Sequence, residues 1–294
     1  SLVGSEMCIR DSLHTVSTEV LEGYDILFSK GKIVRIEKNI MASPETDVYD
    51  VFGKHIIPSY IAPITRIGLV EIGLVKQTRD YAERGTYNPN VKANVSYNPD
   101  SELIPITRSN GVLIANSVPA GGRISGQSSV MMLDGWTREN ATRSFPSGLH
   151  INSPNMKSSS RTDNDKKRLK AARQQLDNLE KMIKDARAYA RLRQTKSRLA
   201  EDYHNEDLRW ESMIPYVEKK LPIFVHANEV RQIEASISWA NRHNLEIIIV
   251  GGKDAWRTTD LLVKNRIPII YEGVTSLPYR RYEDYDQAYK TPSI

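Results

Sequence analysis

The stretch GKHIIPSYIAPITRIGLVEIG, from Gly53 to Gly73, decides the fold. It contains an apolar run with four isoleucines: Ile56, Ile57, Ile61 and Ile64. The run passes Pro58 and ends at Thr65, and an apolar run bounded by turn residues is typical of a strand that is buried on both faces. Such strands belong to parallel sheets, in which functional residues follow the carboxyl ends. We therefore expect a site near Thr65.

Further apolar runs predict six more strands: Val112–Val118, Val130–Leu133, Gly148–Asn152, Pro222–Ala227, Glu246–Gly252 and Ile267–Gly273. Helical patterns at Val230–Arg242 and Trp256–Lys264 separate the last three strands, and this alternation predicts a parallel sheet. The fold class is therefore α/β, a truncated (β/α)8 TIM-like barrel. Because a closed barrel has eight strands, we expect the sequence to be truncated at both ends.

Residues 1–12 differ in origin from the rest of the chain in our interpretation. Residues 2–12, LVGSEMCIRDS, match the conceptual translation of a sequencing adapter, so we interpret 1–12 as a non-native segment and exclude it from the fold. The single cysteine, Cys8, lies within it, and the native part therefore has no thiol for a disulfide, a nucleophile or a metal ligand. Without this segment the formal net charge rises from +5 to +6.

Residues 13–57 read as short strands. Two apolar runs flank Ser29–Lys32 and predict a hairpin, and Val48–Phe52 predicts a third strand. We assign residues 13–57 to a small N-terminal β domain and 58–294 to the incomplete barrel. No run approaches the ~18 apolar residues that a membrane span needs.

A polar helical insertion is predicted at about 157–220. Leucine, isoleucine and alanine recur at heptad spacing and predict a helix from about Asp165 to Arg193 with Leu169, Leu176, Leu179 and Ile183 buried. Twelve lysines and arginines lie between Lys166 and Arg198, which raises nucleic-acid binding as an alternative. Tyr189 is the single aromatic residue in this stretch, too few to stack on successive bases, and we therefore expect a solvated face and no nucleic-acid partner.

The glycine-rich segment Pro119–Ser129 could bind phosphate through backbone amides. It lacks the Lys-Ser/Thr of a P-loop and the G-x-G-x-x-G spacing of a dinucleotide site. We therefore interpret it as a loop that shapes the mouth of the barrel.

The predicted strand ends supply the candidate site residues, which are Thr65, Ser117, Asp134, His150, Asn152, His226, Asn228, Gly251, Tyr271 and Glu272. Among these, we expect Thr65, His150, Asn228 and Tyr271 to line a substrate pocket. His226 is the candidate metal ligand, and a pocket histidine bonded to a neighbour is the alternative.

The opening stretch resembles the entry to the first barrel strand of amidohydrolases, in the imidazolonepropionase-like branch. Three further segments are similar to loops of secreted or periplasmic bacterial members: Asn98–Pro105, Gly126–Ser129 and Leu133–Trp136. The resemblance implies a metal-dependent hydrolase that acts on non-peptide C–N bonds of small amides or cyclic amides. It also implies that residues 13–57 are part of a small N-terminal β-sandwich, and that the protein has a periplasmic or secreted location.

The same resemblance implies a degenerate metal site. The family's first strand ends in His-x-His, where this chain has Pro63 and Thr65, and Gly251 stands in place of a sixth-strand histidine. Proline has no side-chain donor atom and a neutral threonine hydroxyl is a poor ligand. Only His226 falls on a ligand position, so the resemblance implies either no metal or a weakly bound divalent ion such as zinc.

Two functions remain open from the sequence. One is an amidohydrolase-like enzyme with a small-molecule substrate. The alternative is a non-catalytic binding or partner subunit that kept the barrel, as a homo-oligomer or paired with an intact amidohydrolase.

Overall fold

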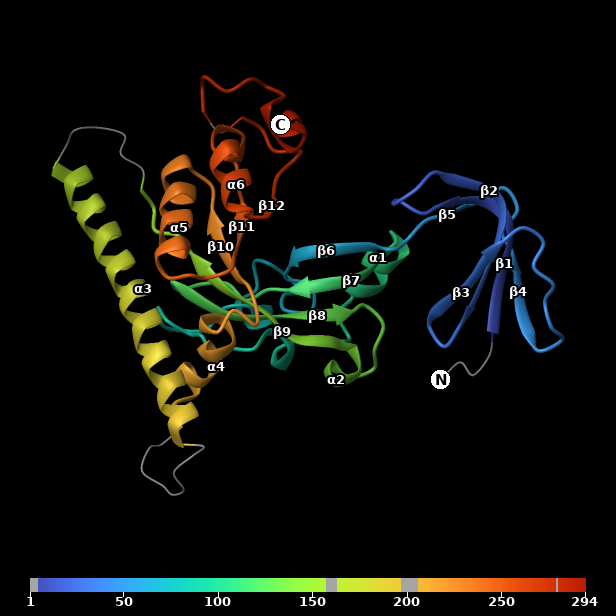
Figure 1. The fold of residues 1–294 in the computed structure, drawn as a ribbon, viewed down its shortest axis with the longest axis horizontal. Helices are drawn as coiled ribbons and strands as arrows, with labels where there is room; N and C mark the ends of the chain where they lie inside the picture. Colours follow the sequence, from blue (N-terminus) through green and yellow to red (C-terminus); the bar gives the residue numbers. More distant parts are fainter. Residues whose placement is uncertain (1–4, 157–162, 197–205, 279) are drawn as a thin grey trace. The chain divides into compact units, whose positions relative to one another are not determined.

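The computed structural model describes residues 5–156, 163–196, 206–278 and 280–294 (Figure 1). The chain forms two compact units, Ser1–Tyr60 and Ile61–Ile294. Each unit has its own sheet, and the second unit carries the strand ends at which we expect a site.

The first unit is one mixed sheet of β1 (Ser5–His14), β2 (Val20–Ser29), β3 (Lys32–Glu37), β4 (Thr46–Asp50) and β5 (His55–Ile56). The strand order is β3-β2-β1-β4, and β5 also pairs with β1. The predicted hairpin is confirmed, because β2 and β3 pair antiparallel through Ser29 and Lys32. The described strands of this unit form a single sheet, and the β-sandwich stays a prediction. Strand β1 includes most of the adapter-like segment, whose origin stays a prediction.

The second unit contains a sheet of seven strands within the described residues, in the order β12-β11-β10-β9-β8-β7-β6. Its strands are β6 (Tyr60–Thr65), β7 (Val112–Ser117), β8 (Ile124–Met132), β9 (Thr142–Asn152), β10 (Ile223–Ala227), β11 (Ile247–Gly251) and β12 (Ile269–Tyr271). Strands β9 to β12 pair in parallel, as the sequence predicts. The fold is therefore mixed α/β with a nearly closed, barrel-like sheet.

The predicted parallel alternation is wrong for β8. This strand pairs antiparallel with both β7 and β9. Only residues 118–123 connect β7 to β8, whereas a parallel crossover needs a dozen or more residues. Gly121 and Gly122, with φ of +90° and +61°, reverse the chain at this point. The segment interpreted as a loop therefore enters a strand at Ile124.

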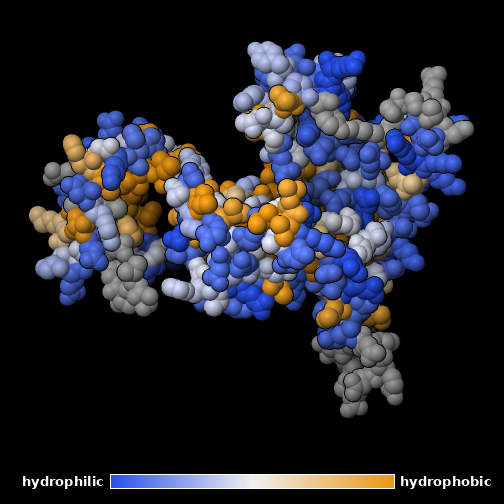
Figure 2. Space-filling model, turned by 180° about the vertical axis from the view of Figure 1, so that it is seen from behind, coloured by the Kyte–Doolittle hydropathy of each residue, from blue (hydrophilic) through white to orange (hydrophobic). Residues whose placement is uncertain are grey.

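The prediction that the first strand is buried on both faces is also wrong. The run is split between β5 and β6, and the side chains of Ile57 and Ile61 are 47% and 60% exposed. Strand β6 ends the strand order, so β7 is its one neighbour in the described sheet. Hydrophobic residues are also visible among hydrophilic ones on the face shown in Figure 2.

The predicted insertion helix is confirmed as α3 (Asp163–Lys196). Leu179 and Ile183 are buried, Leu169 and Leu176 are partly buried, and most of its described lysines and arginines are exposed. Helix α4 (Leu208–Val217) follows and packs against it in the main core. Helix α5 (Val230–Arg242) has the predicted bounds and presents Ile233 and Ile237 to the same core.

Short helices complete the described chain: η1 (Lys76–Thr78), η2 (Ala93–Val95), α1 (Leu103–Ser109), α2 (Arg138–Ala141), η3 (Ala255–Arg257), α6 (Thr259–Asn265), α7 (Gln287–Lys290) and η4 (Thr291–Ser293). Within the described ranges, no helix combines the length and the apolar character that crossing a membrane requires.

Candidate functional site

A pocket of about 240 Å³ lies where the carboxyl ends of the strands converge. Its lining residues are Ile64, Thr65, Arg66, Val118, Pro119, Ala120, Ser125, Asn152, His226 and Glu272. Thr65 ends β6, whereas Glu272 follows β12 at the other edge of the sheet. Because both edge strands contribute to one pocket, the sheet must curl almost into a barrel. The pocket is the place where functional residues gather in such folds.

Two histidines form a pair at this pocket. Nδ1 of His150 lies 3.0 Å from Nε2 of His226, and the two rings belong to the neighbouring parallel strands β9 and β10. His150 is completely buried and stacks on Phe224 with ring centroids 4.7 Å apart. Gly148 makes room for this stack, because a Cβ there would lie 2.1 Å from the Phe224 ring. His226 lines the pocket, and His150 supports it from inside the protein.

Burial keeps both imidazoles neutral. It lowers the pKa of His226 to about 4, and the positive charge of Arg66 contributes to the same shift. Burial also lowers the pKa of His150 well below its ordinary value, with His226 as a smaller cause. At neutral pH the pair therefore carries no charge, and each ring has one N–H donor and one acceptor nitrogen.

Arg66 and Glu272 give the pocket one cation and one anion. The Arg66 guanidinium stacks over the ring of Tyr81, 4.5 Å from its centroid. Stacking of this kind holds a guanidinium in place while its N–H groups stay available for a ligand. Within the described chain, Arg66 is paired with no carboxylate.

Ser125 and Asn152 form a polar wall. The Asn152 side-chain amide donates to Ser125 Oγ and to the carbonyl of Gly122, both at 3.0 Å, and Ser125 Oγ donates to the carbonyl of Gly121 at 2.8 Å. The glycine turn between β7 and β8 is thus bound to the end of β9. Both Asn152 N–H groups are used, so its side-chain oxygen remains as an acceptor for the pocket.

Asn228 belongs to a different environment. Its Oδ1 is buried without a hydrogen-bond partner in the described residues, and it lies beside Gly251. A Cβ at Gly251 would lie 2.5 Å from this oxygen. The Asn228 side chain therefore occupies the space that a side chain at position 251 would need. Asn228 is not among the residues that line the pocket.

The other sequence candidates lie elsewhere. Tyr271 lines a separate, largely apolar cavity of about 570 Å³ between α6 and the C-terminal residues, and none of the other candidate residues lines this cavity. Ser117 donates to the carbonyl of Ile67 and is buried. Asp134 pairs with Arg108 at 3.1 Å. Because β8 runs antiparallel to its neighbours, Asp134, which follows β8, lies at the end of the sheet opposite to the pocket.

Two pocket residues were missed by the sequence reasoning, Arg66 and Ser125. Arg66 follows Thr65 directly, so reading one residue past the strand end would have found it. Ser125 is the second residue of the antiparallel strand β8, and only the direction of β8 brings its amino end to the pocket. The short, glycine-rich connection to β7 was the available signal.

The donor set does not fit a resident metal ion. Within the described residues, no three His, Cys, Asp or Glu side chains come together in a way that could hold one. Nε2 of His226 is engaged by His150, Thr65 Oγ1 already accepts the N–H of Ile67, and Pro63 and Gly251 offer no donor atom. A catalytic zinc needs about three protein ligands. We therefore derive no chemical step through a metal.

Comparison with known proteins gives matches among solved structures; no protein-family model and no curated protein matches the chain. An amidohydrolase from Thermotoga maritima MSB8 is 21% identical over 94% of this chain and 72% of its own, with a TM-score of 0.81. A beta-aspartyl dipeptidase from Fervidobacterium islandicum AW-1 is 12% identical, covering 100% of this chain and 70% of its own, with a TM-score of 0.47. The first match shows that the chain has the amidohydrolase fold.

Proposed function

We propose that this protein, which has the amidohydrolase fold, is a member of the amidohydrolase superfamily that binds a small amide or cyclic amide without a resident catalytic metal. The observation that carries the proposal is the pocket around His226. It has the position of an active site in the fold, but its only imidazole has one nitrogen engaged by His150. The degenerate metal site expected from the resemblance is part of this proposal.

The pocket chemistry supports an amide ligand. A neutral secondary amide offers one carbonyl acceptor and one N–H donor. The pocket offers donors on Arg66 and acceptors on Glu272 and Asn152. Its volume of about 240 Å³ lies just below the ~300–1,000 Å³ typical of drug-sized ligand sites, which favours a ligand smaller than a drug. We also propose that the protein acts in the periplasm or outside the cell.

Hydrolysis of a C–N bond is the second candidate. It is favoured by the shared fold and by a neutral histidine in the pocket, since a neutral imidazole can donate a hydrogen bond to a carbonyl and polarise it. A role as a subunit that pairs with an intact amidohydrolase, or with a second copy of itself, is compatible with the binding proposal.

Calorimetric titration with hydantoin, N-acetylglycinamide and N-acetylglycine, followed by NMR for product, separates the candidates. Binding without turnover, with or without added zinc, is the result we expect. Turnover that requires zinc and is lost in His226→Ala would establish the hydrolase. The pocket proposal is wrong if none of the three probes binds, or if a probe that binds is bound equally well by Thr65→Trp, a variant that would block the pocket.

A further inference from the structure

The ring of His226 has one nitrogen committed to the protein and one available to the pocket. Nε2 faces Nδ1 of the completely buried His150 at 3.0 Å. Nδ1 of His226 has no hydrogen-bond partner in the described residues, yet it is not one of the enclosed atoms that lack a partner. Because His226 lines the pocket, Nδ1 is the ring nitrogen that a ligand can reach.

The surroundings of His150 fix the direction of this hydrogen bond. Nε2 of His150 is buried and has no partner in the described chain. A proton there would be a buried N–H without an acceptor, which folded proteins rarely contain. The single proton of neutral His150 therefore belongs on Nδ1, which donates to Nε2 of His226. His226 must then carry its own proton on Nδ1 and present a donor to the pocket.

Arg66 lies close enough for its charge to affect His226, and it lines the same pocket. Its guanidinium is stacked on Tyr81. Two preorganised donors, one of them charged, thus face a common space. An arginine fork matches the two oxygens of a carboxylate, and hydrogen bonds assisted by charge are about twice as strong as neutral ones.

We propose that Arg66 and the Nδ1–H of His226 form a carboxylate subsite for a small ligand, and that His150 is the positioning residue that keeps His226 a donor. Glu272 lines the same small pocket, so a ligand with a second negative charge would be repelled. The ligand class is therefore a small monocarboxylate with an amide group. This inference rests on the proposed function because it concerns the same pocket.

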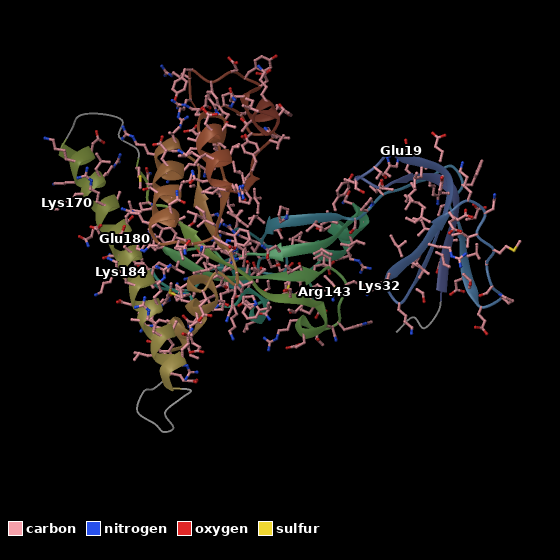
Figure 3. All side chains as sticks on the ribbon, in the orientation of Figure 1. Glu19, Lys32, Arg143, Lys170, Glu180 and Lys184 are labelled. Carbon is pink, nitrogen blue, oxygen red and sulfur yellow. The ribbon has the colours of Figure 1, made fainter. Side chains whose placement is uncertain are left out.

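Paired probes test the subsite. N-acetylglycine and N-acetylglycinamide differ in their carboxylate and amide ends, and we expect the carboxylate to bind at least tenfold more tightly, a preference that Arg66→Met abolishes. Arg143→Met is the matched control: it also removes one positive charge, but from an exposed residue at the amino end of β9, far along the strand from Asn152 (Figure 3). Equal affinities for the two probes, unchanged in Arg66→Met, would overturn the subsite and leave the pocket proposal standing. Failure of both probes and hydantoin to bind would overturn the pocket proposal, and this inference with it.

The nitrogen NMR shifts of His226 test the positioning role. We expect Nδ1 to be protonated. His150→Asn places an amide donor near the original Nδ1 and should retain both this tautomer and the preference for N-acetylglycine. His150→Leu, with unfolding temperature measured alongside, should lose both while remaining folded. A proton on Nε2 of His226 in the unsubstituted protein, or an intact carboxylate preference in folded His150→Leu, would overturn the assignment.

Discussion

Gly251 lies at a position where the surrounding structure leaves no room for a side chain. It ends β11 with φ of +97°, a conformation that suits glycine. The space beside it is filled by Asn228, whose backbone N–H donates a hydrogen bond to Gln232 Oε1 at 3.1 Å. A histidine at this position, as the family resemblance would require, needs both a different backbone conformation and a displaced Asn228. Glycine at position 251 and the Asn228 side chain beside it therefore fit together.

The substitution Gly251→Ala should lower the free energy of unfolding by about 2–3 kcal/mol, because left-handed strain costs ~1–2 kcal/mol and the new Cβ would overlap Asn228 Oδ1. Urea denaturation measures the change. Gly73→Ala is the control, since its φ is ordinary and no atom lies within 4 Å of the added Cβ. The double variant with Asn228→Ala should recover the part due to overlap. Equal stability of Gly251→Ala and Gly73→Ala would contradict this account.

His226 should make stability depend on pH. Its pKa is about 4 in the folded protein and ~6.5 when unfolded, so the unfolded state binds more protons between these values. The stabilisation is therefore fully present above pH 6.5 and is lost as pH falls towards 4, by about 3 kcal/mol at ~1.4 kcal/mol per unit. His226→Gln should remove most of this loss. A constant difference between the two proteins from pH 4 to 7 would argue against a buried neutral His226.

At the scale of elements, the apolar runs located the strands and the heptad pattern located α3, because burial of a stripe requires that periodicity. The direction of β8 and the exposure of β6 were not recoverable from apolar runs alone. Direction follows from connection length, and exposure follows from position in the strand order. For the same reason Thr65 and His226 could be proposed as site residues from strand ends, whereas Ser125 could not.

Helix α3 is attached to the barrel by a hydrogen bond, by an ion pair and by apolar packing. Arg123, in the turn between β7 and β8, donates hydrogen bonds to the side-chain oxygen of Gln175 in α3 and to the carbonyl of Asn152. The bond to Asn152 is 2.5 Å long. Glu180 of α3 pairs with Arg242 of α5 at 2.8 Å. Through Arg123, the insertion helix supports the end of β9, which forms part of the pocket.

The apolar seam of α3 should supply most of this attachment. Ile183 is 1% exposed in the main core, and Ile183→Ala should therefore lower the free energy of unfolding by about 2–4 kcal/mol. Lys184, its exposed neighbour, serves as the control, and Lys184→Ala should change stability by less than about 0.5 kcal/mol (Figure 3). Similar values for the two variants in chemical denaturation would mean that the seam does not pack as described.

For the molecule as a whole, we propose that an amidohydrolase fold carries a pocket that binds its ligand through hydrogen bonds in place of metal coordination. The resemblance implies that Pro63, Thr65 and Gly251 stand at three ligand positions, and the imidazole of His226 forms a hydrogen-bonded pair with His150. The fold was foreseeable from motifs. The pair was not, because His150 and His226 are far apart in sequence and meet only through the pairing of β9 with β10.

The metal content of the purified protein tests this central claim most directly. Protein prepared without chelators, then equilibrated with one equivalent of zinc and desalted, should retain far less than one equivalent, because one imidazole nitrogen and one exposed carboxylate give few ligands and little preorganised geometry. His226→Ala should retain the same small amount. Nearly stoichiometric zinc that is lost in His226→Ala would contradict the account, since it would show that His226 serves as a metal ligand and not as a hydrogen-bond donor.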